Sequence, residues 1–251
     1  MYQKKIAIYV EGQTEQIFLN RLIQVWWDYS GIEIKNIKIM AGEEKKPLVQ
    51  DFQSPDPETY FLICDVAGVG GLASTIASRS KKQHEKGFKI IGLRDLYAND
   101  FCSLPANVDR SLEIIKNFKK SLLIQKCHCP DEINIYLAVM EIEAWLLAFT
   151  EAIAKWAKIS EETILNKISE NLHTPEIINL ERIKRPSILL RDLGEIGLRQ
   201  QSKSVGAITL MVNNIDREHI EKVHASNQIP SFNKFWNELL AFTCIKEKIQ
   251  G

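Results

Sequence analysis

The stretch IAIYVEGQTEQIFLNRLIQVWW, residues 6–27, decides the fold class. It begins with five apolar residues and continues with apolar side chains at the spacing of a helix that buries one face. The same order of a short apolar run and a helix-like segment occurs three more times. The runs are YFLIC (60–64) before 72–83, FKIIGL (88–93) before 108–123, and INIYLAVM (133–140) before 141–157. Apolar runs separated by helices predict an α/β fold, a mostly parallel sheet with helices on both faces.

The remainder of the chain extends this pattern on both sides. IEIKNIKIM (32–40) is a further strand candidate, and its polar positions are typical of a sheet edge. After residue 157 only helix-like segments follow, and prolines at 175, 186 and 230 mark boundaries between them. Ser160 is the expected N-cap of the first. We therefore expect an α/β domain over 1–157 and a C-terminal helical region over 158–251.

Composition restricts the class of protein. The chain has 251 residues, 45% of them hydrophobic, and its 32 basic residues balance its 32 acidic residues, so it can form a core but is not drawn to nucleic acid by net charge. Nucleic-acid binding would need a metal, a partner or a local patch such as Arg182, Lys184 and Arg185. No apolar run approaches the roughly 18 residues of a membrane span, and no signal peptide is evident, so we expect a cytoplasmic protein with no membrane contact.

Acidic residues end the predicted strands. Glu11, Asp65, Asp95 and Glu141 each follow one apolar run directly or nearly so, and Glu143 comes two residues later. The carboxyl ends of parallel strands share one edge, where ligands of open α/β sheets bind. Carboxylates gathered there repel one another unless a cation lies between them, and an all-oxygen cluster selects Mg²⁺ or Mn²⁺. The pattern predicts metal-dependent phosphoryl chemistry, although an acid after a strand is also a common helix cap.

Two details of this edge lead to separate expectations. On a helix Glu141 and Glu143 lie about 200° apart, so only one would face the crevice, and Glu143 in the first turn is preferred. Gly12 and Thr14 lie in the turn after the first strand, where free N–H groups can hold a phosphate.

The five cysteines are an odd number in a chain without export signals, so thiols are expected rather than disulfides. Cys127, His128 and Cys129 form the one cluster with soft-metal character. Because no second Cys/His pair stands at zinc-finger spacing, an ordinary loop before a strand is the preferred interpretation.

The motifs VEGQTE (10–15), RDLYAND (94–100) and MEIEAWLLAF (140–149) together resemble the Toprim domain, the α/β metal-binding domain of topoisomerases, primases and the overcoming-lysogenisation-defect nucleases. With KRPSILL (184–190) and KSVGAITL (203–210), the chain is similar to a bacterial Toprim-like family often associated with an ATPase partner in defence against phage. The resemblance covers roughly 4–150 at the level of the fold.

The resemblance implies roles for individual residues. Glu11 corresponds to a glutamate that assists phosphoryl transfer, and Asp95 to the first acid of an Asp-x-Asp metal motif. Position 97 is Tyr, so Asp65, Asp100 or Glu143 would have to supply the second acid. Lys203 is similar in placement to a lysine near the scissile phosphate.

The leading hypothesis is a Toprim-like, Mg²⁺-dependent nuclease, an effector of anti-phage defence that acts on DNA or RNA with an ATPase partner. The alternative is a non-catalytic, regulatory or antitoxin-like subunit that keeps the scaffold for partner binding, and a nucleotide phosphohydrolase is a third reading. The polymer, the cleavage specificity, the number of metals and the oligomeric state stay open.

Overall fold

A computed structural model describes residues 2–96, 108–174, 179–198 and 205–243. The described residues contain a seven-stranded sheet in the order β3-β2-β5-β1-β6-β7, with β4 also paired to β2. The strands are β1 (Lys4–Val10), β2 (Ile32–Met40), β3 (Glu43–Lys45), β4 (Phe52–Gln53), β5 (Thr59–Asp65), β6 (Lys89–Leu96) and β7 (Asn134–Val139). All pairs among β2, β5, β1, β6 and β7 are parallel, and only β3 and β4 run antiparallel. The expected mostly parallel sheet is confirmed.

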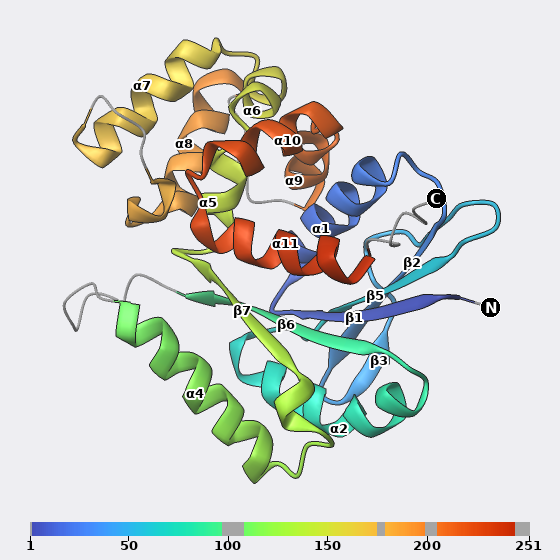
Figure 1. Cartoon of the computed structure of the whole chain (residues 1–251). Helices are drawn as coiled ribbons and strands as arrows, with labels where there is room; N and C mark the ends of the chain where they lie inside the picture. Colours follow the sequence, from blue (N-terminus) through green and yellow to red (C-terminus); the bar gives the residue numbers. More distant parts are fainter. Residues whose placement is uncertain (1, 97–107, 175–178, 199–204, 244–251) are drawn as a thin grey trace, which may run out of the picture.

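Helices cover both faces of the sheet, as Figure 1 shows. On one face α2 (Leu72–Glu85) and α4 (Val108–Ile124) bury Ile76 and Phe118 against Ala7 and Tyr9 of β1. On the other face α1 (Gln13–Trp26) and the C-terminal helices pack against the alternate residues of the same strands. The chain therefore leaves β1 toward one face and leaves β5 and β6 toward the other, and such a change of direction opens a crevice at the carboxyl ends of the strands.

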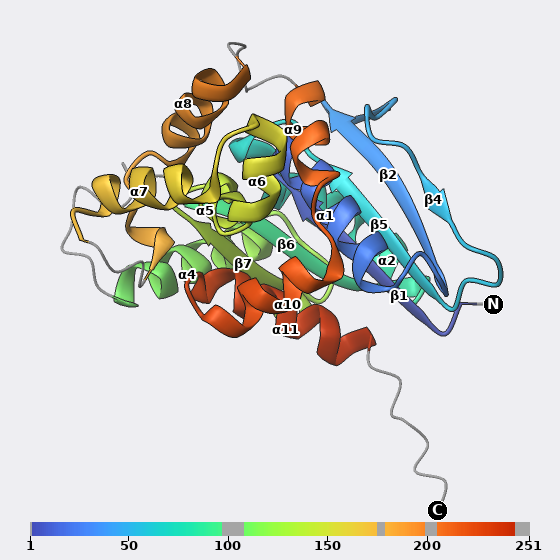
Figure 2. The same ribbon diagram turned by 90° about the horizontal axis from the view of Figure 1, so that it is seen from above.

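The C-terminal helices form a layer over the sheet, visible from above in Figure 2. They are α5 (Ile142–Leu147), α6 (Thr150–Ala157), α7 (Glu161–Leu172), α8 (Pro186–Leu198), α9 (Val205–Val212), α10 (Arg217–Ser226) and α11 (Pro230–Thr243). Trp236 of α11 is fully buried and contacts Trp26 of α1 edge-to-face, with ring centroids 5.4 Å apart. The helices after residue 157 thus share one core with the sheet, and the division at that residue stays a prediction.

Several expectations about the C-terminal helices can be compared with the structure. Ser160 is the N-cap of α7, where its hydroxyl oxygen accepts the N–H of Thr163 at 3.2 Å, as expected. Pro186 and Pro230 are the first residues of α8 and α11, which suits a residue without an N–H. Pro175 lies outside the described residues.

Other elements differ from the expectations. The predicted helix over 141–157 is two helices, because the helical conformation ends at Leu147 and resumes at Thr150. Helix α10 and the short strands β3 and β4 have no counterpart among the expected elements. The strand over 32–40 is the outermost long strand on its side of the sheet, and the short strands β3 and β4 pair with its outer edge. Within the described ranges, no helix combines the length and the apolar character needed to span a bilayer.

Candidate functional site: an acidic cleft

An open cleft of about 260 Å³ lies at the carboxyl ends of β1, β6 and β7. Five of the residues that line it are carboxylic acids, and we call this set the acidic cleft: Glu11, Glu15, Asp95, Glu141 and Glu143. The cleft is also lined by Gly12, Gln13, Thr14, Gly68, Ile142 and Ser187. Four of the five acids predicted at the sheet edge therefore meet in one cavity.

Asp95 reaches the cleft because β6 extends past its neighbour. Val10, the last residue of β1, pairs with Leu93, so Asp95 stands two residues beyond the end of β1 and faces the same side as Leu93. Its side chain is 6% exposed, and its Oδ1 accepts the N–H of Ile142 at 3.0 Å. One carboxylate thereby fixes the start of α5 and contributes charge to the cleft.

Glu11 follows β1 directly and is 4% exposed. Its Oε1 lies 3.5 Å from Nε of Arg94, the residue that precedes Asp95 on β6. Its carbonyl oxygen accepts the N–H of Gly68 at 2.8 Å, which ties the first turn to the loop after β5. Arg94 is the cation that the structure places against this acid.

Glu15, the last residue of the VEGQTE motif, is not among the acids predicted at the sheet edge, and the structure places it in the cleft. It stands in the first turn of α1, and a Cβ built on Gly12 would meet its Oε2 at 3.3 Å, so glycine leaves room for this carboxyl group. Burial, together with the nearby Glu143 and Glu11, raises the pKa of Glu15 to about 8. A glutamate four residues after the strand-ending Glu11, in the first turn of the following helix, is the sequence signal that would have identified it.

The pKa of Asp95 is raised for the same reasons. Burial is the largest cause, and repulsion from Glu15, Glu143, Glu11 and Glu141 adds to it. In the absence of a cation, these two carboxyl groups therefore bind a proton more tightly than exposed acids do. Such a set favours a bound cation, which removes the repulsion between carboxylates.

The expectation that only one of Glu141 and Glu143 would face the crevice is wrong, since both line the cleft. Helix α5 begins at Ile142, so Glu141 is its N-cap and the angular spacing within a helix does not apply to the pair. Glu141 has φ 79° and ψ 157°, a conformation that almost only glycine adopts. The preceding Met140 also has positive φ, at 61°. This costly turn brings the Glu141 side chain to the edge that its neighbours share.

The structure does not bring Asp65 into the cleft. Its Oδ2 lies 3.6 Å from Nζ of Lys38 on the neighbouring strand, and its Oδ1 accepts the N–H of Ala67 at 2.8 Å. Lys38 supplies the opposite charge that we had expected a metal to supply. Lys203, Tyr97 and Asp100 lie outside the described residues.

The turn after β1 and the start of α8 also border the cleft. Gly12 and Thr14 line it, where we expected phosphate binding, and Ser187 lines it from the first turn of α8. The exposed Lys184 and Arg185 directly precede that turn in the chain. Two exposed basic residues thus come three and two residues before Ser187 of the cleft in the chain.

The donor set of the cleft fits Mg²⁺ or Mn²⁺. All of its charged donors are carboxylate oxygens, which hard divalent cations prefer. Oε2 of Glu141 is buried and makes no hydrogen bond among the described residues, so it remains available as a ligand. Asp95 keeps one carboxylate oxygen besides the one that accepts the Ile142 N–H.

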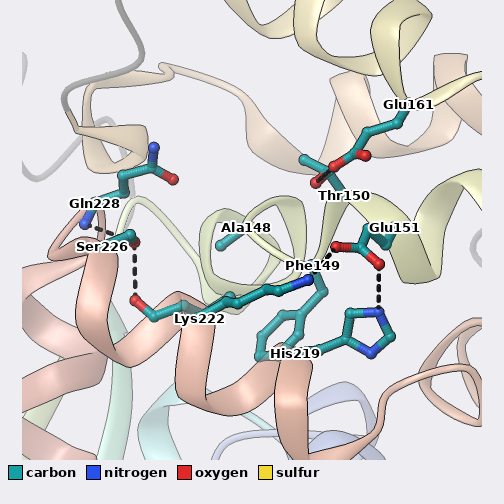
Figure 3. A pocket seen from close by; sticks show the side chains of 10 residues that line it. Ala148, Phe149, Thr150, Glu151, Glu161, His219, Lys222, Ser226 and Gln228 are labelled. Atoms are coloured by element: carbon teal, nitrogen blue, oxygen red, sulfur yellow. Dashed lines mark hydrogen bonds and ion pairs between the residues drawn. The ribbon is translucent and has the colours of Figure 1, made fainter.

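A second pocket, of about 150 Å³, lies between α6 and α10 and is shown in Figure 3. Glu151 lines this pocket and binds Nζ of Lys222 at 2.9 Å and Nε2 of His219 at 3.2 Å. These groups satisfy one another, and their bonds connect the two helices. We assign this pocket a structural role.

The fold and the acidic cleft define the class: an α/β protein with a carboxylate-rich site at the carboxyl edge of a parallel sheet. The chain belongs to the family described as a domain of unknown function, DUF4276, whose model matches residues 10–240. No curated protein and no solved structure matches the chain.

Proposed function

We propose that the protein is a Mg²⁺-dependent nuclease, a phosphodiesterase that cleaves DNA or RNA at the acidic cleft. The observation that carries the proposal is the meeting of five carboxylates, from the ends of β1, β6 and β7 and the start of α1, in one open cavity. The Toprim resemblance of VEGQTE and RDLYAND supports the same chemistry, with Glu11 and Asp95 at its centre. A cytoplasmic location and a role in phage defence with an ATPase partner belong to this proposal.

The residues of the cleft would have different roles in catalysis. Glu11, Asp95 and Glu141 are the metal ligands in this proposal, and Glu15 and Glu143 flank them. A bound Mg²⁺ supplies a Lewis acid that polarises a phosphate oxygen and lowers the pKa of a water nucleophile. Arg94 holds the Glu11 carboxylate in place through its ion pair, and Asp95 anchors the turn that presents Glu141.

The substrate would approach across the start of α8. Ser187 lines the cleft, and the exposed Lys184 and Arg185, which come shortly before it in the chain, would contact phosphates of the nucleic-acid backbone. Because the whole chain is neutral, these local contacts and the metal carry the attraction. We expect the isolated chain to bind nucleic acid weakly without a divalent cation.

A nuclease assay with single- and double-stranded DNA and RNA in Mg²⁺ tests the proposal. Wild type should cleave at least one polymer, and Glu11→Gln and Asp95→Asn should each lower the rate by about 100-fold or more, in the range of losing a group that stabilises transition-state charge. Glu58→Gln removes the same charge from an exposed position outside the cleft and should leave the rate unchanged. Equal rates for wild type and both cleft variants would refute the assignment.

The ion pairs of the site favour a second candidate, a non-catalytic subunit that keeps the scaffold for binding an ATPase partner. Arg94 against Glu11 and Lys38 against Asp65 neutralise two of the strand-ending acids without any metal ion. Calorimetric titration with Mn²⁺ separates the two candidates. Site-specific binding that Glu11→Gln abolishes supports the nuclease, whereas no binding supports the scaffold subunit.

A further inference from the structure

A second group of metal-ligating side chains lies at the opposite end of the sheet. His84, His128 and Cys129, which we call the His–Cys cluster, each offer one ligand atom, and these atoms all lie within 4.8 Å of one another. They line a cleft of about 450 Å³ together with residues at the amino ends of β6 and β7, whereas the acidic cleft lies at the carboxyl ends. The two sites are therefore separate.

The backbone around the cluster is held from several sides. His84 stands in the last turn of α2, and the N–H of His128 donates to Oγ of Ser80 one turn earlier in the same helix, at 3.0 Å. Cys129 has a left-handed conformation with φ 50° and is the N-cap of the short 3-10 helix Pro130–Glu132 that precedes β7. Nζ of Lys119 on α4 donates to the carbonyl oxygen of Pro130 at 2.8 Å. These contacts fix the backbone positions from which the three side chains extend.

The histidines are also positioned relative to each other. The rings of His84 and His128 meet edge-to-face with centroids 4.9 Å apart. Oε2 of Glu132 lies 3.4 Å from Nδ1 of His84. A carboxylate against one ring nitrogen selects the tautomer of a metal-binding histidine and leaves the other nitrogen free to bind. Glu132 is therefore placed as the outer partner of a ligand.

We propose that the His–Cys cluster is a Zn²⁺ site, with His84, His128 and Cys129 as ligands and Glu132 as the partner that orients His84. Two imidazole nitrogens and one sulfur are the donors that Zn²⁺ prefers, and they differ from the all-oxygen set of the acidic cleft. On binding, the Cys129 thiol passes its proton to solvent and the sulfur binds the metal as a thiolate.

The three ligand atoms would have to move only slightly closer to one another to bind Zn²⁺. Ligands that bind Zn²⁺ tetrahedrally at about 2.0–2.3 Å lie roughly 3.5 Å from one another, and the present separations of up to 4.8 Å close by side-chain rotation. The side chain of His84 is 44% exposed, so the solvent-facing side of the ring leaves room for this small rotation. Three protein ligands leave the fourth position open toward the cleft, where water or a small ligand can bind.

Cobalt spectroscopy on the full chain tests the proposal, because Co²⁺ replaces Zn²⁺ and a Co²⁺–thiolate bond absorbs in the near ultraviolet. Wild type, kept reduced with a phosphine, should show this absorption saturating at one equivalent of Co²⁺, and Zn²⁺ should displace it. Cys129→Ser should abolish it. His84→Asn and His128→Asn should weaken Co²⁺ binding by more than the roughly 10–100-fold that loss of an outer partner costs.

Two controls keep the result specific. His173→Asn removes an exposed histidine at the C-cap of α7, a left-handed position that asparagine tolerates, and should leave the absorption unchanged. Glu11→Gln alters only the acidic cleft and should also leave it unchanged, so failure of the proposed nuclease function would not affect this result. Circular dichroism checks that each variant is folded. No saturable thiolate absorption in wild type, or the same absorption in folded Cys129→Ser, would overturn the proposal.

Discussion

Replacing Glu15 by glutamine should stabilise the metal-free protein at alkaline pH. The carboxyl group is buried beside other acids, and its pKa is about 8 in the folded protein against 4.5 for an ordinary glutamate. The folded state thus holds a proton that the unfolded chain releases, so folding stability falls as the pH rises through this interval. Glutamine has the shape of the protonated acid and cannot ionise. The stabilising effect of the variant should therefore grow with pH.

The pKa values set the size of the effect. At 1.36 kcal/mol for each tenfold change in acidity, a pKa of about 8 against 4.5 corresponds to an upper limit of about 5 kcal/mol above pH 8. Water in the open cleft and rotation of neighbouring side chains relieve part of this repulsion, so we expect roughly 2 kcal/mol at about pH 8. Near pH 4.5 and below, where both states hold the proton, wild type and variant should differ by less than about 0.5 kcal/mol.

Urea unfolding in a chelator, followed by circular dichroism at about pH 5 and about pH 8, measures the difference. Glu58→Gln, an exposed glutamate outside the cleft, should show no such dependence on pH. Saturating Mg²⁺ should reduce the advantage of Glu15→Gln, because a cation among the carboxylates offsets the repulsion that destabilises the ionised Glu15 of wild type. A variant that loses stability equally at both pH values would refute the reasoning.

Three further predictions concern the fold and the turn before α5. Trp236→Ala should lower the free energy of unfolding by about 3–5 kcal/mol, because the side chain is fully buried between helices of both halves; urea unfolding measures it. Asp216→Ala should cost about 0.5–2 kcal/mol by thermal unfolding, because Asp216 and His219 form the capping box of α10. Glu141→Gly should raise stability by about 1 kcal/mol, because glycine relieves the positive φ, and it should lower nuclease activity by the loss of a ligand; an unchanged rate would exclude Glu141 from the site.

The parts of the fold that were predicted from the sequence have strong periodicity. Four long strands of the parallel sheet were expected because each is an apolar run followed by a helix-like segment. The elements that were missed lack such a signal. Strands β3 and β4 have three and two residues, too few to show alternation. Helix α10 buries only His219, Ile220 and Val223, so its apolar face is narrow.

Some residues of the candidate site were likewise predictable from the sequence, and others were not. Glu11, Asp95 and Glu141 were expected because chain position alone places the ends of parallel strands at one edge. Glu143 and Glu141 both reach the cleft through a turn with positive φ at Met140 and Glu141, which no sequence periodicity records. Asp65 also ends a strand, but its neighbour on β2 is Lys38, and only strand register decides that neighbour.

By itself the sequence determined the α/β class, the parallel sheet and the edge at which acids gather, because these follow from hydrophobic periodicity and strand polarity along the chain. Only the tertiary structure decided which groups share a cavity. Glu15 joins the acidic cleft through the placement of α1, and His84 meets His128 and Cys129 across more than 40 residues of chain. Metal ligation and electrostatic repulsion depend on distances of a few ångströms, and packing between distant segments sets those distances.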